Sequence, residues 1–225
     1  MQFEILDKTF QVPLNKKVLI KDCITIRKGN IIGLWGANGI GKSTLLKRIY
    51  LEFSTNQFDI IKPFADYEKF KIGIIPQNIN ELIFPWLKVD KIIDIFQSNF
   101  FALNGNISIS EVTNCSKKIR NLSGGEKQIL ALELILNFKF QVLFLDEPFS
   151  AMDFDNMRKY LKKLSSYAYE NGAIIFIVVH DLLVLQNISD FFLIFSQKRN
   201  EVKPIKNNSK DANVISTELL ERLYD

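Results

Sequence analysis

A glycine-rich segment, Gly36–Ser43 (GANGIGKS), constrains the fold of this 225-residue chain more than any other feature. It matches the pattern G-x-x-x-x-G-K-[ST], in which backbone N–H groups wrap a polyphosphate. The apolar segment Ile31–Trp35 before it predicts a buried strand, and Lys42–Phe53 after it has apolar residues at helical spacing. A strand–turn–helix corner with incidental glycines is the alternative, but this context is the one that a phosphate loop requires. We therefore expect the chain to bind ATP and to hydrolyse it.

The side chains of this segment have separate predicted tasks. Lys42 supplies a positive charge for the β- and γ-phosphates, and the Ser43 hydroxyl is a predicted Mg²⁺ ligand. The helix that begins near Lys42 points the positive end of its dipole at the same anion. The predicted ATP-binding residues are Gly36, Ala37, Asn38, Gly39, Ile40, Gly41, Lys42, Ser43, Thr44 and Asp146.

Two adjacent acids follow a second apolar segment, Leu143–Leu145. The carboxyl end of a parallel strand opens into the ligand crevice of an α/β sheet. Asp146 is therefore predicted to hold Mg²⁺ through water, and Glu147 to polarise the attacking water. A solvated acidic pair at the start of a loop is the alternative.

The segment Leu122–Glu126 (LSGGE) supports two interpretations at once. Ser123 and Glu126 form the Ser-x-x-Glu pattern of a capping box, which predicts only the start of a helix. The bare amides of Gly124 and Gly125 also make an anion site with a helix dipole behind it.

The remaining chain predicts alternating strands and helices. Predicted strands are Ile72–Ile75, Val142–Leu145, Ala173–Val179 and Phe191–Phe195, and predicted helices are Ser123–Asn137 and Asp153–Tyr169. Such alternation is typical of a parallel sheet covered on both faces. The first thirty residues predict short strands, and the polar stretch 87–119 predicts helix. No apolar run reaches the ~18 residues of a spanning helix.

All six motif segments together resemble the nucleotide-binding domain of ABC ATPases, from about residue 2 to about residue 196. They are Gly36–Ser43, Gln77, Leu122–Glu126, Leu143–Glu147, Ser150–Asp153 and His180. The resemblance implies an α/β P-loop NTPase (RecA-like) fold with a mainly parallel sheet, an N-terminal antiparallel β subdomain and an inserted α-helical subdomain. We expect one domain over 1–225, with the insertion at about 80–138 and a C-terminal extension at about 198–225. Within that extension, 198–211 is predicted to be a polar, mobile loop and 216–224 a closing helix.

The resemblance also implies roles for particular residues. ATP would lie between the glycine loop of one copy and the signature of the other, in a homodimer or with a paired ABC ATPase subunit. Glu147, His180 and Gln77 would be catalytic, and Asp153 would bridge the two sites. The implied trans-site signature is Ser123, Gly124, Gly125 and Glu126, and the implied Mg²⁺ ligands are Ser43 and Gln77, with Asp146 through water.

Some positions depart from the family pattern. Leu14 stands where the family has an aromatic residue that stacks on adenine, and the nearest aromatic, Phe10, is displaced. After the signature, Gln128 is followed by Ile129 in place of the usual arginine, and Leu134 takes the position of a later arginine.

Three functions remain open for such an ATPase. The first is the energy-coupling subunit of an ABC transporter, cytoplasmic and peripheral on the membrane, docking onto permease subunits around 82–87 and serving a solute-binding protein. The others are a soluble ABC ATPase acting on nucleic acid or ribosomes, which this length disfavours, and an iron–sulfur assembly ATPase. With a net charge of only +4, no nucleic-acid partner is expected. Phe84–Val89 and Glu147–Asp153 resemble small-solute importers of the nitrate/sulfonate/taurine group, with a compact peptide or antibiotic exporter as the alternative.

Overall fold

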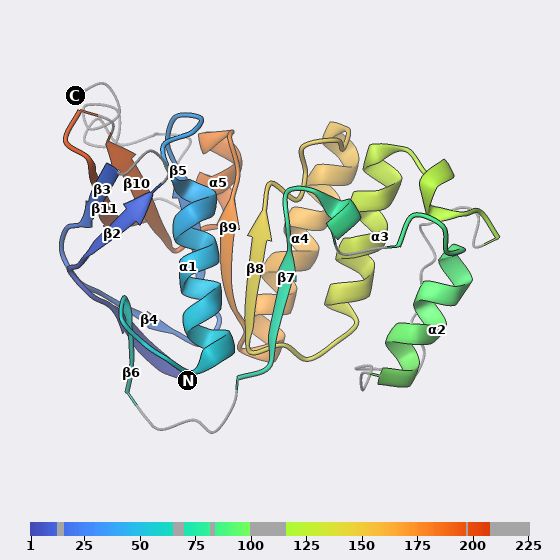
Figure 1. Cartoon of the computed structure of the whole chain (residues 1–225), viewed down its shortest axis with the longest axis horizontal. Helices are drawn as coiled ribbons and strands as arrows, with labels where there is room; N and C mark the ends of the chain where they lie inside the picture. Colours follow the sequence, from blue (N-terminus) through green and yellow to red (C-terminus); the bar gives the residue numbers. More distant parts are fainter. Residues whose placement is uncertain (13–15, 65–69, 82–83, 100–115, 197, 208–225) are drawn as a thin grey trace.

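The structure is a computed structural model of the chain, and it describes residues 1–12, 16–64, 70–81, 84–99, 116–196 and 198–207. An eight-stranded sheet runs through the middle of the molecule (Figure 1). Its strands, in spatial order, are β2 (Thr9–Val12), β3 (Lys16–Ile20), β11 (Glu201–Lys206), β10 (Phe191–Ser196), β5 (Ile31–Trp35), β9 (Ile174–Val178), β8 (Val142–Asp146) and β7 (Ile72–Ile75).

The central strands of this sheet, from β10 through β5, β9 and β8 to β7, are parallel. Antiparallel pairing occurs at the other end, between β10 and β11 and between β2 and β3. A separate antiparallel sheet has the order β4-β1-β6 and consists of β4 (Ile24–Arg27), β1 (Gln2–Ile5) and β6 (Ile61–Pro63). The mainly parallel α/β class and the N-terminal antiparallel part are therefore confirmed.

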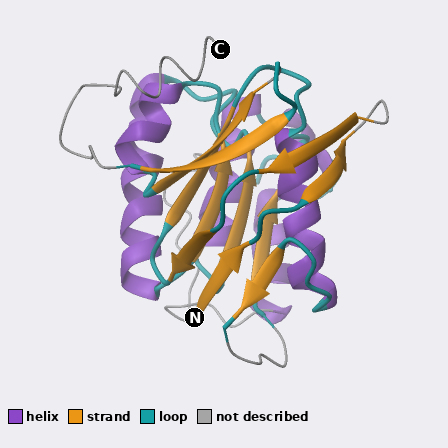
Figure 2. Ribbon diagram, turned by 90° about the vertical axis from the view of Figure 1, so that its left-hand side faces the viewer, coloured by secondary structure: helices purple, strands orange, loops and turns teal. Residues whose placement is uncertain are grey.

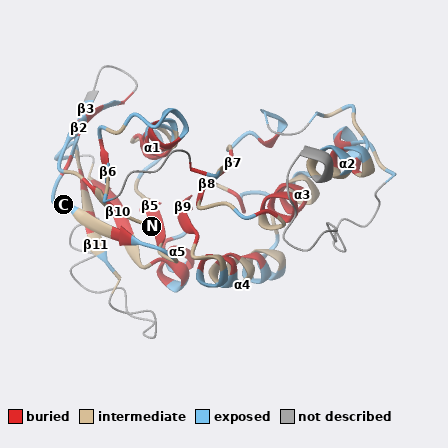
Figure 3. Cartoon of the chain, turned by 90° about the horizontal axis from the view of Figure 1, so that it is seen from below, coloured by how far each residue is buried: buried red, intermediate tan, exposed pale blue. Residues whose placement is uncertain are grey.

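Helices cover both faces of the parallel strands (Figure 2). In Figure 3, α1 (Lys42–Thr55) lies on one side, and α4 (Phe154–Asn171) and α5 (Leu182–Ile188) lie on the other. Strand β8 shows why: Val142 and Phe144 pack into the core beneath α1, whereas Leu143 and Leu145 pack into the opposite core. Because both sets are fully buried, the strand is apolar at every position rather than at alternate ones.

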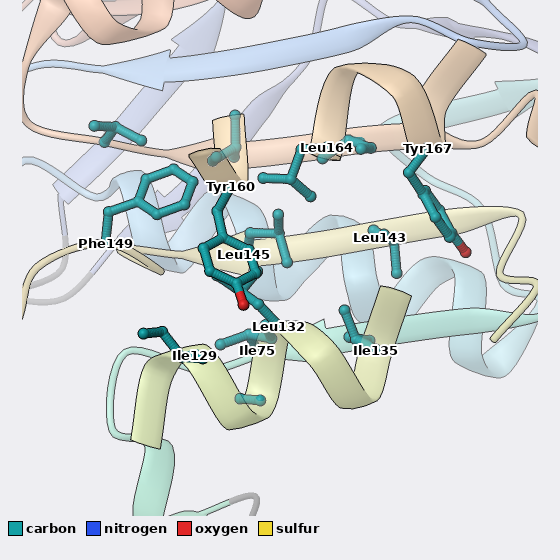
Figure 4. Close-up of a cluster of buried hydrophobic side chains, with 14 of the residues drawn as sticks. Ile75, Ile129, Leu132, Ile135, Leu143, Leu145, Phe149, Tyr160, Leu164 and Tyr167 are labelled. Atoms are coloured by element: carbon teal, nitrogen blue, oxygen red, sulfur yellow. The ribbon is translucent and has the colours of Figure 1, made fainter. Parts of the chain in front are cut away.

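Helix α3 (Gly124–Leu136) belongs to the core that contains Leu143 and Leu145, on the face of the sheet opposite α1 (Figure 4). Ile129, Leu132 and Ile135 of α3 pack with Leu143 and Leu145 of β8. Helix α2 (Val89–Asn99) lies outside α3, on the far side from the sheet (Figure 1). This helical region contains the predicted insertion, whose boundaries at about 80 and 138 stay a prediction.

The prediction of a polar loop at 198–211, within the C-terminal extension, is wrong in part. Residues 201–206, expected within a polar loop, form β11, which pairs with β10 and β3. Val202 is fully buried while its neighbours Glu201 and Lys203 are partly exposed. The segment thus has the alternating burial of a strand, although its composition is rich in charged residues. Helix α5 and strand β6 were not expected at all, and the predicted helix 216–224 lies outside the described residues.

Candidate nucleotide-binding site

The glycine loop connects β5 to α1 and depends on glycine at a defined place. Gly41 has φ 114°, and a Cβ there would lie 2.6 Å from Cγ1 of Val12. Neither the backbone conformation nor the space admits another residue. Gly39 also has a positive φ, 74°, but nothing lies within 4 Å of where its Cβ would be. The loop is therefore packed tightly on its inner side and open on its outer side.

The Lys42 side chain is folded back over this loop. Its Nζ donates to the carbonyl oxygens of Gly36, at 2.8 Å, and of Ala37, at 3.0 Å. Only 5% of Lys42 is exposed, and this burial lowers its pKa, while the charges of Glu147 and Asp146 act in the opposite direction. The loop carbonyls thus hold a cation at its mouth, where a phosphate group would be attracted.

Ser43 and Asp146 form an oxygen pair beside that cation. The Ser43 hydroxyl donates to Oδ1 of Asp146 at 2.9 Å. Asp146 ends β8 and is 2% exposed, and burial raises the pKa of its carboxyl. Hydroxyl and carboxylate oxygens suit Mg²⁺, which takes few protein ligands and completes its shell with phosphate and water. The described residues contain no cluster of three His, Cys, Asp or Glu side chains able to hold a metal.

Glu147 lies between Gln77 and His180. Its Oε1 is 2.7 Å from Nε2 of His180, and its Oε2 accepts from Nε2 of Gln77 at 3.2 Å. The three residues follow β8, β7 and β9, whose carboxyl ends meet at one edge because the strands are parallel. Glu147 has φ 53°, which is uncommon and costs free energy outside glycine. Its N–H donates to the carbonyl of Val178 at 3.1 Å, which helps to hold that conformation.

These groups face one cavity of about 300 Å³. Its described lining consists of Asn38, Gly39, Gly41, Lys42, Ser43, Thr44, Gln77, Glu147 and His180. A phosphate-binding loop, the Ser43 hydroxyl and a sheltered carboxylate therefore share one space, and Asp146 lies behind Ser43 through their hydrogen bond. That arrangement can bind a nucleoside triphosphate and direct water at its terminal phosphate.

The signature segment, Ser123 to Glu126, is not part of that described lining. Ser123 caps α3: its hydroxyl accepts from the N–H of Glu126 at 3.2 Å, and its own N–H donates to Oε2 of Glu126 at 2.7 Å. The second of these contacts, from the Ser123 backbone N–H to the carboxylate, is the main cause that lowers the pKa of Glu126. The capping box predicted from the sequence is confirmed.

A contact inside the chain also explains the glycine at position 125. A Cβ on Gly125 would lie 2.7 Å from the carbonyl oxygen of Ala151, in the turn that follows Glu147. The same turn is held by Gln128, whose Nε2 donates to Oγ of Ser150 at 2.8 Å and whose Oε1 accepts from the N–H of Ala151 at 2.9 Å. From the sequence, Gln128 was distinguished only as a family position, and its contacts with this turn could not be inferred from spacing.

Two other residues considered from the sequence, Asp153 and Phe10, make contacts within the chain. Asp153 is the N-cap of α4 and accepts from the backbone N–H of Asn156 at 2.8 Å, a hydrogen bond that lowers the pKa of its carboxyl. Phe10 is only 6% exposed and belongs to the core beneath α1, so its ring is not available to stack on a base. Leu14 lies outside the described residues.

The chain is similar to known ATP-binding proteins. A family model described as ABC transporter matches residues 21–150. The tungstate uptake system ATP-binding protein TupC of Peptoclostridium acidaminophilum is 31% identical over 185 residues, covering 77% of this chain and 85% of that protein. The zinc import ATP-binding protein ZnuC of Rickettsia bellii is 28% identical over 196 residues, covering 84% and 80%. An ABC transporter ATP-binding protein of Methanocaldococcus jannaschii is 30% identical over 179 residues, and the match spans 28% of its length.

Solved structures show the same fold. An ATP-binding subunit of an ABC transporter superposes with a TM-score of 0.72 at 17% identity, covering 100% of both chains. A dimeric ATP-binding cassette in a post-hydrolysis state, bound to ADP and Pi, superposes with a TM-score of 0.65 at 20% identity, covering 93% of this chain and 100% of that one.

A match of the family model to more than half of the residues defines the class of this protein: the chain belongs to the ABC transporter family. Within that family it is an ATP-binding subunit and an ATPase. In the described part of the chain, no helix combines the length and the apolar character needed to cross a bilayer.

Proposed function

We propose that this chain is the energy-coupling subunit of a multi-subunit ABC importer of small solutes, working as a dimer on the cytoplasmic face of the membrane. The observation that carries the proposal is the position of Glu147, held between Gln77 and His180 at the cavity that Lys42 and Ser43 line. Each of these groups matches one requirement of phosphoryl transfer to water.

The proposed mechanism assigns these groups as follows. Lys42 turns its ammonium from the loop carbonyls to the β- and γ-phosphates. Ser43 and Gln77, with Asp146 through water, would hold Mg²⁺, which when bound would neutralise charge on the phosphate oxygens. Glu147 orients the attacking water and accepts its proton. His180 offers its Nε2, now beside the carboxylate, to the γ-phosphate.

We further propose that Ser123 and Gly125 complete the site of a second copy. The absence of the signature from the described cavity lining supports an action in trans rather than in cis. Ser123 and Gly124 are exposed at the start of α3, where free N–H groups and the helix dipole attract an anion.

A substitution at Ser123 tests the trans site without disturbing the helix. Asp and Asn both cap helices as well as Ser does, so Ser123→Asp and Ser123→Asn should both fold. The carboxylate repels the partner's γ-phosphate, so Ser123→Asp should keep monomer ATP affinity but lose dimerisation and hydrolysis, and Ser123→Asn is the neutral control. Mixing Ser123→Asp with Lys42→Ala should restore some activity, because one of the two composite sites is then intact. Loss of ATP binding by the Ser123→Asp monomer would place the signature in cis.

The proposed docking surface for the permease is the aromatic pair Phe84 and Trp86. These side chains are 53% and 65% exposed, and their ring centroids lie 5.3 Å apart. Their segment is joined by backbone hydrogen bonds to the residues just before the signature: Arg120 N–H donates to the carbonyl of Pro85, and Ile119 N–H to that of Leu87, both at 2.8 Å. A displacement of the aromatic pair would therefore move the segment that leads into Ser123.

The substrate class rests on relatives. The names of two similar proteins concern tungstate uptake and zinc import, which favours an importer. The resemblance of Phe84–Val89 and Glu147–Asp153 to the nitrate/sulfonate/taurine group remains a prediction, as does a solute-binding protein. A compact exporter and an iron–sulfur assembly ATPase stay the alternatives.

A photo-crosslinking amino acid in place of Trp86 tests transport. In native membranes it should capture a membrane-spanning permease subunit, whereas the same amino acid in place of Tyr169, which is 86% exposed on α4, should not. Capture of soluble iron–sulfur assembly proteins from position 86 would instead support the assembly function and contradict transport.

A further inference from the structure

Trp35 makes a contact that the catalytic assignment does not use. It ends β5, whose other residues are aliphatic or glycine, and it directly precedes Gly36 of the phosphate loop. Its indole Nε1 donates to the backbone carbonyl of His180 at 3.0 Å. An indole thus joins the start of the phosphate loop to the residue that contacts Glu147.

The sheet explains how residues 145 positions apart meet. Strands β5 and β9 are parallel neighbours, with Leu34 opposite Val178. The two segments that follow them therefore leave the sheet side by side. After β9, Asp181 caps α5 by accepting from the N–H groups of Leu183 and Val184. His180 therefore sits in a turn between a strand end and a helix cap.

The imidazole of His180 is itself weakly enclosed. Its side chain is 49% exposed, and its ring contacts Oε1 of Glu147 through Nε2. The position of the ring therefore depends on how its backbone is held. The Trp35 hydrogen bond acts on that backbone, at the carbonyl of the same residue.

We propose that Trp35 is a positioning residue for hydrolysis: its indole N–H holds the His180 turn against the phosphate loop, so that the imidazole stays in register with Glu147. Trp35 contacts neither the nucleotide nor the water in this scheme; it acts through His180. The inference rests on the roles proposed above for Glu147 and His180. A reshaping of the loop at Gly36 when ATP binds would be transmitted to His180 through this hydrogen bond.

The rival explanation is packing alone, because Trp35 also packs against the core beneath α4 and α5. The test must therefore remove the N–H and keep the ring. β-(3-Benzothienyl)alanine replaces the indole N–H by sulfur with nearly the same shape. The chain has two tryptophans, so in a Trp86→Phe reference chain this analogue enters only at position 35.

Compared with that reference chain, the analogue should lower kcat for ATP hydrolysis by about three- to tenfold, the worth of one hydrogen bond. The KM for ATP should stay within about twofold, because the phosphate-binding groups are untouched. Trp35→Phe is the second variant and should show the same split. An unchanged kcat with the analogue would overturn the positioning role. A rise in KM as large as the fall in kcat would also overturn it.

A double-mutant cycle with His180→Ala separates this inference from the proposed function. If Trp35 acts through the imidazole, the analogue should change kcat by less than about twofold once the imidazole is gone. Full additivity of the two losses would show that Trp35 acts elsewhere and would overturn the inference alone. If His180→Ala hydrolyses ATP at the reference rate, the proposed role of His180 falls, and the inference falls with it.

Discussion

Nε2 of His180 lies 2.7 Å from Oε1 of Glu147, although the two side chains differ greatly in their access to solvent. The Glu147 side chain is 13% exposed and that of His180 is 49% exposed. The carboxylate is thus sheltered while its partner faces the open side of the cavity. A base that must act on a single water benefits from this shelter, because competing solvent is kept away.

Glu147→Gln should stop hydrolysis and keep nucleotide binding. The amide can still bond with His180 and Gln77 but cannot accept the proton of the attacking water. We expect kcat to fall by at least about a hundredfold, with ATP affinity within about twofold. Single-turnover phosphate release and a titration with ATP measure the two quantities. Turnover close to that of the unaltered chain would remove Glu147 as the base.

Lys42→Ala should weaken ATP binding by about tenfold to a hundredfold, the range for losing charge-assisted hydrogen bonds. Lys47→Ala is the matched control, because Lys47 lies on the same helix but is exposed. It removes the same charge outside the loop and should bind ATP nearly as before. Isothermal titration calorimetry compares the two, and equal losses would mean that net charge rather than the loop position decides affinity.

Asp146→Asn should stabilise the protein in the absence of nucleotide while removing Mg²⁺-dependent hydrolysis. Burial raises the pKa of Asp146 above its ordinary 3.8, so the folded state binds this proton more tightly than the unfolded state does. Stability therefore falls as the pH rises from 3.8 through the raised pKa, and above that pKa the ionised carboxyl carries the full cost of its burial. The neutral amide avoids that cost and can still accept from Ser43.

The Tm of Asp146→Asn at neutral pH should exceed that of the unaltered chain by about 2–4 °C, equivalent to about 1 kcal/mol. The difference should shrink as the pH falls through the raised pKa and be lost below 3.8, where the aspartate is protonated in both states. Differential scanning calorimetry across this range checks the sign. A difference that grew towards acid would contradict the assignment of a buried, proton-retaining carboxyl.

Gly125→Ala should destabilise the isolated subunit even without nucleotide. A methyl group there would sit 2.7 Å from the carbonyl oxygen of Ala151, and relieving such a clash costs about 1–3 kcal/mol. At Gly124 the nearest atom is the Cβ of Ala151 at 3.0 Å, so Gly124→Ala should lose less. Thermal melting ranks the two variants, and a Gly125→Ala chain as stable as its parent would refute the close approach.

The sequence was informative wherever function depends on a contiguous segment. The phosphate loop, the capping box of α3 and the acids that end β8 were predicted because each requires defined residue types at fixed spacing. The parallel core was predicted because strands buried on both faces are continuously apolar.

Features made by distant pairs were not predicted. The hydrogen bond between Trp35 and His180 exists only because β5 and β9 are neighbours. Strand β11 was missed because its charged composition is typical of a loop. It forms a strand because it pairs with β10, which is not evident from its own sequence. Helix α5 was missed because a seven-residue, mostly buried apolar helix has no amphipathic period that distinguishes it from a strand.

The bonds that link the segment of Phe84 and Trp86 to residues 119 and 120 join backbone atoms only. Side chains on that segment can therefore be exchanged without cutting the link to α3. If the aromatic pair docks a permease, the atoms that recognise the partner are separate from the atoms that transmit its motion. Evolution can then refit this ATPase to a different membrane subunit by changing a few exposed side chains, with the internal transmission inherited intact.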